Sequence, residues 1–215
     1  MYPSAICRLS VPLAASIFRA SIAVAETTTV GAVDKVQAQV EATQAGQTRP
    51  LGVKSEIYFR DRCRSREGAR LQATLKDGTQ LTLGENATVV VDEFIYDPVM
   101  SRGELSIRVV KGAFLLVGGQ IEGVNGANVQ IRTPAGAIGL RGTTVWGGPI
   151  DKGYGVIVLS GEVTVTGRRG TVTLKQGQGT MFFGDGKPRR AAAWPAGRMK
   201  RAVASITFGK PPARP

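Results

Sequence analysis

Apolar and polar residues alternate along much of the chain in short runs that are typical of β-strands. Over residues 71–75, apolar side chains at every second position are separated by Gln72 and Thr74, so one face would be buried and the other exposed. The turn sequence Asp77-Gly78 follows, and the alternation resumes over residues 81–83. A strand, an Asp-Gly turn and a second strand predict a hairpin or a tight corner.

The strand–glycine–strand pattern returns further along the chain. It recurs over residues 105–117 and 156–166, and a further pair of apolar runs occupies residues 171–183. These units are too unevenly spaced for a propeller or a leucine-rich array. After residue 50, only residues 199–204 hint at a short helix. We therefore expect an all-β protein, folded as a twisted, β-solenoid-like roll of short strands.

The chain divides into four predicted parts. Residues 1–25 have the features of a signal peptide, because Arg8 precedes an apolar run and Ala23-Val24-Ala25 fits the small-x-small cleavage pattern. The alternatives are a disordered N-terminus on a cytosolic protein and a membrane anchor, for which the run is short of about 20 residues. Residues 26–50 are expected to form a flexible leader with one strand near Val30–Val36, and residues 51–184 the main β domain.

The fourth part, residues 185–215, is a basic tail rich in proline and alanine that we expect to be largely disordered. The chain has 28 basic and 16 acidic residues, a net charge of +12, but residues 26–186 carry only about +2. The tail is either a solvated extension or a docking element for an anionic membrane surface or envelope polymer. Nucleic acid is not an expected partner, because export would separate the two. The candidate docking residues are Lys187, Arg189, Arg190, Trp194, Arg198, Lys200 and Arg201.

The sequence offers no recognisable catalytic or metal-binding constellation. It contains no histidine, no G-x-S-x-G motif and no phosphate-binding loop. Adjacent acids such as Asp92 and Glu93 would point to opposite faces of a strand. Cys63 lies among four arginines, which would favour the thiolate of a redox-active or intermolecular-disulfide cysteine; the alternative is a small residue packed in a strand. We expect no enzyme activity, no cofactor and no bound metal.

Two motifs carry a family resemblance. One is the segment Leu75–Gly84, which contains Asp77-Gly78-Thr79, and the other is the segment Val129–Thr143. Their order and spacing resemble the FecR domain family, over about residues 50–165. The resemblance implies a periplasmic all-β domain that relays or stabilises protein contacts and has no catalytic activity. Regulators of this family carry a sigma-binding domain and a membrane helix before the periplasmic part, whereas a signal peptide and a basic tail are expected here.

The motif residues are expected to be structural. They are Asp77, Gly78, Thr79, Pro134, Gly139, Arg141, Gly142 and Thr143. Arg141 stands in an apolar stretch and would be partly buried, either paired with a carboxylate from Glu93, Glu104 or Glu162, or acting as a clamp for an anionic ligand.

These features lead to three hypotheses of function. The first is a non-catalytic periplasmic module that binds another envelope protein or polymer. The second is a signal-relay subunit of iron-siderophore-type regulation that acts with a separately encoded transducer. The third, a hydrolase of cell-wall glycans, would need two carboxylates brought together by the fold.

Overall fold

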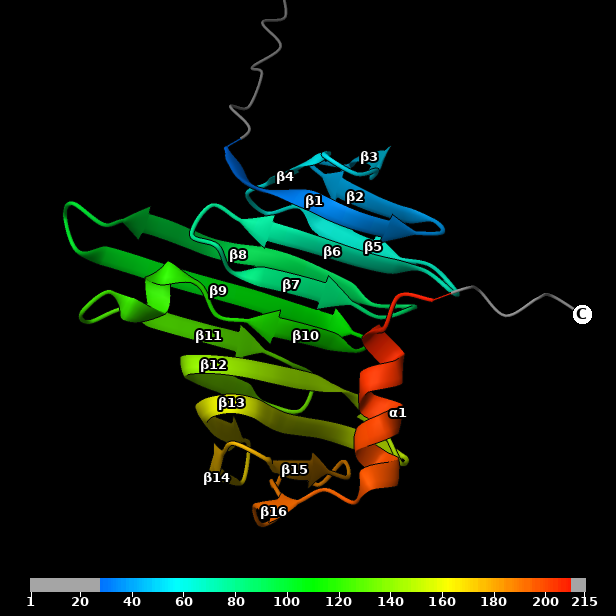
Figure 1. Ribbon diagram of the computed structural model, residues 1–215, viewed down its shortest axis with the longest axis vertical. Helices are drawn as coiled ribbons and strands as arrows, with labels where there is room; N and C mark the ends of the chain where they lie inside the picture. The colour runs from blue at the N-terminus through cyan, green and yellow to red at the C-terminus, as the bar shows by residue number, and fades with distance from the viewer. Residues whose placement is uncertain (1–27, 210–215) are drawn as a thin grey trace, which may run out of the picture.

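The computed structural model describes residues 28–209, so the expected signal peptide lies outside the described residues. The chain is mostly β and forms one 16-stranded sheet that curls strongly into a half-barrel (Figure 1). In chain order the strands are β1 (Thr29–Gln37), β2 (Val40–Gln44), β3 (Gln47–Pro50), β4 (Glu56–Tyr58), β5 (Arg62–Ser65), β6 (Arg70–Leu75), β7 (Gln80–Leu83), β8 (Thr88–Asp97), β9 (Arg102–Lys111), β10 (Phe114–Val117), β11 (Asn128–Arg132), β12 (Ala137–Ile150), β13 (Gly153–Gly167), β14 (Gly170–Lys175), β15 (Gln178–Phe182) and β16 (Ala192–Ala193). Two helical elements complete the fold, the 3-10 helix η1 (Gln120–Gly123) and the α-helix α1 (Ala196–Ile206).

The half-barrel consists of two arms that meet at β12. The first arm has the strand order β3-β2-β5-β8-β9-β11, and the second has β10-β7-β6-β1-β4. The start of β12 pairs with β11 and its second half pairs with β10. The long strand β13 runs alongside β12 and extends the sheet to β14 at one end and β15 at the other. The long strand β12 therefore joins the two arms, and β13 pairs with it along nearly its whole length.

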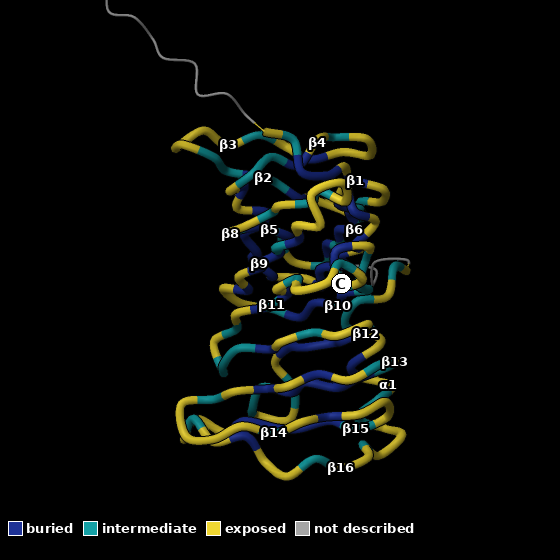
Figure 2. The backbone as a smooth tube through the Cα atoms, turned by 90° about the vertical axis from the view of Figure 1, so that its left-hand side faces the viewer, coloured by how far each residue is buried: buried dark blue, intermediate teal, exposed yellow. Residues whose placement is uncertain are grey.

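The core lies on the inner face of the curled sheet. Figure 2 shows the buried residues concentrated between the two sides of the stack. The alternation predicted over residues 71–75 is present, because Leu71, Ala73 and Leu75 are buried in β6 while Gln72 and Thr74 are only half-buried. The same cluster includes Phe114 of β10 and Ile107 of β9. The expected all-β class is thus confirmed.

The expected solenoid-like stacking is not how the strands pair. Successive coils of a solenoid pair in parallel, but here only β9 and β11 form a parallel ladder and the other ladders of the described residues are antiparallel. Antiparallel strands can be joined by tight turns, and glycine-containing corners do this along the chain. The Asp77-Gly78 turn joins the paired strands β6 and β7, whereas Gly112 lies between β9 and β10, which belong to different arms, and Gly161 lies within β13. The repeated strand–glycine–strand pattern therefore marks a hairpin, a crossing between the arms and an irregularity inside a long strand.

The leader and the tail are more ordered than the sequence predicted. Within residues 26–50, the described part forms β1, β2 and β3, and Val30, Val33 and Val40 are buried in the core. Within residues 185–215, β16 and α1 pack on the sheet, and α1 covers its outer side (Figure 1). Burial of these apolar side chains offsets the entropy cost of ordering both segments.

The second, smaller core lies between α1 and the outer face of the sheet. Ala202 of α1 is buried there with Ala113, Trp146 and Ile157.

No helix within residues 28–209 is both long enough and apolar enough to cross a membrane.

Candidate functional site

The Asp77-Gly78-Thr79 motif forms a buried turn that holds η1 in place. The Asp77 carboxylate accepts hydrogen bonds from the backbone N–H of Thr79 at 3.1 Å and from its hydroxyl at 2.6 Å. The Asp77 carbonyl accepts one from the N–H of Gln120 at 2.8 Å, at the start of η1. Gly78 has a φ of 84°, which favours glycine. The geometry gives this motif a structural role.

The second motif spans the turn from β11 to β12 and a bulge inside β12. Pro134 lies in the turn, and Gly139 lies in β12 opposite Gln130 of β11. Gly142 has a φ of 63° at the point where the register with β13 shifts. The N–H of Thr143 then donates to the Glu122 carboxylate at 2.9 Å. Burial raises the pKa of Glu122.

The side chain of Arg141 is more exposed than the sequence predicted. Its side chain is exposed, and within residues 28–209 it forms no ion pair with Glu93, Glu104 or Glu162. Although Glu162 is its backbone partner on β13, the expected buried pair is absent. The alternation is regular from Ile138 to Arg141, with Ile138 buried and Gly139 and Arg141 exposed, so Arg141 lies on the outward face of the strand although its neighbour Leu140 is apolar.

Cys63 is a packed core residue and not an activated thiol. The side chain is buried on the inner face of β5, whereas Arg62 and Arg64, its neighbours along the strand, point to the opposite face. Burial, together with the nearby Asp61 carboxylate, raises the pKa of Cys63 to about 12. The expectation that neighbouring arginines would favour its thiolate is wrong.

The candidate docking residues of the tail do not form one free basic surface. Arg198 and Arg201 both bind the Asp151 carboxylate, at 2.6 and 2.5 Å, and these contacts lower the pKa of Asp151. Arg189 pairs with Asp185 at 3.0 Å. Trp194 packs against the sheet with Trp146. Among the described residues, Lys187, Arg190 and Lys200 are left without an ion pair.

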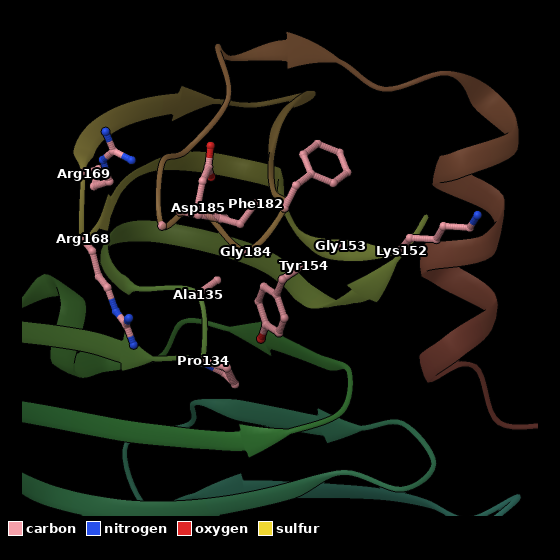
Figure 3. A pocket seen from close by; sticks show the side chains of 12 residues that line it. Pro134, Ala135, Lys152, Gly153, Tyr154, Arg168, Arg169, Phe182, Gly184 and Asp185 are labelled. Carbon is pink, nitrogen blue, oxygen red and sulfur yellow. The ribbon is translucent and has the colours of Figure 1, made fainter.

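A cleft of about 600 Å³ lies where the last strands meet the tail (Figure 3). Its walls come from the β11–β12 turn, the start of β13, the β13–β14 turn and the loop after β15. The lining residues are Pro134, Ala135, Lys152, Gly153, Tyr154, Arg168, Arg169, Phe182, Phe183, Gly184, Asp185 and Gly186. Of these, only Pro134 was singled out from the sequence.

Tight turns position the cations of this cleft. Asp151 and Lys152 have φ values of 50° and 62°, as in the two-residue turns that join antiparallel strands. Lys152 thus lies at the end of the cleft nearest α1 (Figure 3). Arg168 and Arg169 form the β13–β14 turn at the other end, where the N–H of Arg169 donates to the Gly186 carbonyl at 3.0 Å.

The polar groups of the cleft favour an anion. Its one carboxylate, Asp185, is already engaged by the N–H of Lys187 and by Arg189, and its pKa is lowered accordingly. Three cations remain, Lys152, Arg168 and Arg169. The Tyr154 ring points toward Pro134 (Figure 3), and its hydroxyl is buried. Burial raises the pKa of Tyr154, and the nearby Thr133 side chain offsets only part of this rise, so the phenol stays neutral.

The described residues contain no group of three or more His, Cys, Asp or Glu side chains that could hold a metal ion. The cleft brings together one carboxylate, one phenol and three permanent cations. Such a set binds and orients an anion. Sequence reasoning missed it because the residues are far apart in the chain; the Arg168-Arg169 pair between two glycines was the available signal.

Comparison with known proteins gives two findings. Residues 61–164 match the model of the family described as FecR protein. Two crystal structures of a proposed anti-sigma factor from Parabacteroides distasonis ATCC 8503, at 1.65 and 2.50 Å resolution, match with TM-scores of 0.49 and 0.50 and 16% identity. Each match covers 64% of this chain and 61% of the other. The match with a TM-score of 0.50 shows a shared fold alone. No curated protein matches the sequence.

Proposed function

Because residues 61–164 form a FecR domain, we propose that this protein is a non-catalytic binding module of the periplasm. In this proposal it holds an anionic group of another envelope component in the cleft between β13, β14 and the loop after β15. The observation that carries the proposal is the charge of that cleft, which is lined by three basic residues and by one carboxylate that is already paired.

The composition of the cleft supports binding more than reaction. Glycoside hydrolysis requires a pair of carboxylates flanking the bond that breaks, and Asp185 is the single carboxylate among the lining residues. Its contacts with Arg189 and the N–H of Lys187 keep it ionised. A hydrolase of cell-wall glycans finds no support in this geometry.

An in-cell crosslink tests the proposal. A photoreactive residue in place of Phe183, which lines the cleft with half of its surface exposed, should capture an envelope component that mass spectrometry identifies. The Arg168→Gln/Arg169→Gln variant should lose this crosslink, whereas Arg190→Gln, which removes an exposed cation outside the cleft, should retain it. A crosslink that is unchanged by the double substitution would contradict the assignment of the cleft.

A second candidate function is the relay of a signal to a sigma factor. It is favoured by the FecR domain and by the fold shared with the proposed anti-sigma factor. In this case the component captured at Phe183 would be a protein, and the double substitution would change transcription from promoters of the cognate sigma factor. Unchanged transcription with a lost crosslink would favour the binding module alone.

A further inference from the structure

Three arginines form a row across the outer face of the first arm. Arg62 of β5 lies opposite Val90 of β8, Val90 lies opposite Arg108 of β9, and Arg108 lies opposite Arg132 of β11. Residues directly opposite in paired strands point to the same face of a sheet. The three guanidinium groups, which we call the arginine row, thus follow a line perpendicular to the strands. It spans three strand intervals, or about 14 Å.

The charge of the arginine row is only partly compensated. All three side chains are exposed, and Arg108 makes a two-point contact with the Asp92 carboxylate through Nε at 2.7 Å and Nη2 at 2.6 Å. Arg62 and Arg132 form no ion pair within residues 28–209. Like charges aligned across strands destabilise a sheet. Anions bound along the row would offset this cost.

Two further features indicate a ligand surface. A hollow of about 570 Å³ opens beside the row, bounded by Arg60, Arg62, Arg108 and the β2–β3 turn. Arg60 has a φ of 64°, a strained conformation for a residue with a side chain, of the kind that clusters at functional sites. Asp92 is the single acid that lines the hollow, and Arg108 occupies its two oxygens.

The arginine row leads toward the cleft. Arg132 is the last residue of β11, and the next residues of the chain form the turn whose Pro134 and Ala135 line the cleft. Across the sheet, Arg132 lies opposite Ala137 of β12. Ala137 in turn lies opposite Thr166 of β13, which precedes Arg168 by two residues. Tyr154 and Phe182 of the cleft pack against the inner core, whereas the row lies on the outer face, so one extended ligand would reach both by passing over the β11–β12 turn at the end of these strands.

We propose that the arginine row binds a polysaccharide that carries repeated carboxylates, laid across the strands with one acidic unit in the cleft. The proposal rests on the binding function proposed above and names its ligand class. Guanidinium groups bind carboxylates at two points, as Arg108 does with Asp92. Repeated cations along a flat line match repeated anions of a polymer better than one small anion. At the cleft, the half-exposed ring of Phe183 offers an apolar surface to a sugar ring.

Calorimetric titration of the full chain with galacturonate monomer and with long galacturonate oligomers tests this inference. We expect the oligomers to bind at least about tenfold more tightly than the monomer, since added contacts of about 1.4 kcal/mol give that factor. Added salt should weaken the oligomer more than the monomer. Neutral oligosaccharides of equal length should not bind.

Matched variants separate the row from the cleft. Arg62→Gln/Arg132→Gln should remove the advantage of the oligomers and leave monomer binding unchanged, whereas Arg168→Gln/Arg169→Gln should weaken both. The control Lys76→Gln/Arg102→Gln removes two exposed cations remote from both sites and should change neither.

Three results would overturn the inference about the polymer. They are oligomers that bind no more tightly than the monomer, row variants that retain the advantage of the oligomers, and tighter binding of polyphosphate or single-stranded DNA than of galacturonate oligomers. In the first two cases, monomer binding that depends on Arg168 and Arg169 would leave the function of the cleft standing. Absence of all anion binding would refute that function as well.

Discussion

The indole ring of Trp194 packs edge-on against that of Trp146, with ring centroids 5.8 Å apart and planes inclined by 75°. This contact joins the tail to the outer face of β12. It lies in the small core between α1 and the sheet, and the N–H of Trp146 donates to the Ser205 hydroxyl at 3.1 Å. The tail is thus part of the folded domain.

Trp194→Ala is expected to lower the free energy of unfolding by about 2–3 kcal/mol, because it removes a large half-buried ring and its aromatic contact. Urea unfolding followed by circular dichroism measures the change. Phe183→Ala removes a half-exposed ring outside this core and should cost less than about 1 kcal/mol. Equal losses in the two variants would show that Trp194 does not anchor the tail.

Gly155→Ala should destabilise the protein by about 1–3 kcal/mol through overpacking. A Cβ at this position would lie 2.7 Å from the Trp194 ring. Gly139→Ala is a matched control in the neighbouring strand, where the nearest atom would be 3.9 Å away, and it should change stability by less than about 0.5 kcal/mol. Thermal unfolding of both variants decides the matter, and an unaffected Gly155→Ala variant would contradict the packing described.

Asp77→Asn should cost about 2 kcal/mol, because the buried carboxylate accepts two hydrogen bonds from Thr79 and an amide nitrogen in place of one oxygen accepts none. Chemical unfolding gives the value. Asp34→Asn alters an exposed carboxylate that also accepts from a threonine hydroxyl, that of Thr74, and should change stability by less than about 0.5 kcal/mol. Similar effects at both positions would exclude a special role for the buried turn.

The Cys63 thiol should resist alkylation in the native protein at neutral pH, because its pKa is raised to about 12 and its side chain is buried. Mass spectrometry of the peptide that contains Cys63, after exposure to iodoacetamide, measures the modification. The same peptide should react readily in urea at higher pH. Rapid labelling of the folded chain would restore the redox hypothesis.

The contact of α1 with Asp151 should depend on pH. Hydrogen bonds from Arg198 and then Arg201 lower the pKa of Asp151 in the folded state. Its contribution to stability is therefore present above about pH 4, the unfolded value, and is lost as the pH falls through the lower folded pKa. The stability difference between the native chain and Asp151→Asn should shrink over that range.

A double substitution provides the control for this prediction. In the Asp151→Asn background, Arg198→Gln/Arg201→Gln should cause little further loss of stability at neutral pH. A large further loss would mean that the two arginines stabilise α1 through other contacts.

Local patterns in the sequence were sufficient to predict the strands of the core and the Asp77-Gly78 turn. They also predicted β1, near Val30–Val36, although its register with β6 shifts between Val33 and Lys35. They were insufficient for β2 and β3, which fall in the expected flexible leader. In α1, basic residues conceal the apolar positions Met199, Ala202 and Ile206, although their spacing is helical. The short helix indicated over residues 199–204 is present and extends over Ala196–Ile206.

The candidate sites needed the three-dimensional pairing of strands. The arginine row joins residues 62, 108 and 132, which only the registers of three ladders bring together. The cleft joins turns that lie far apart in the chain. In contrast, the exposure of Arg141 follows from the two-residue alternation of β12, in which Ile138 is buried and Arg141 is exposed; the apolar neighbours of Arg141 concealed that alternation.

The strand β12 joins both arms of the half-barrel, and β13 pairs with β12 along nearly its whole length. Neither arm can separate from the other while these two strands keep their ladders, so local opening of one half is coupled to the cooperative unfolding of the whole. Backbone amides at the centre of β12 and β13 should accordingly be the slowest to exchange with deuterium.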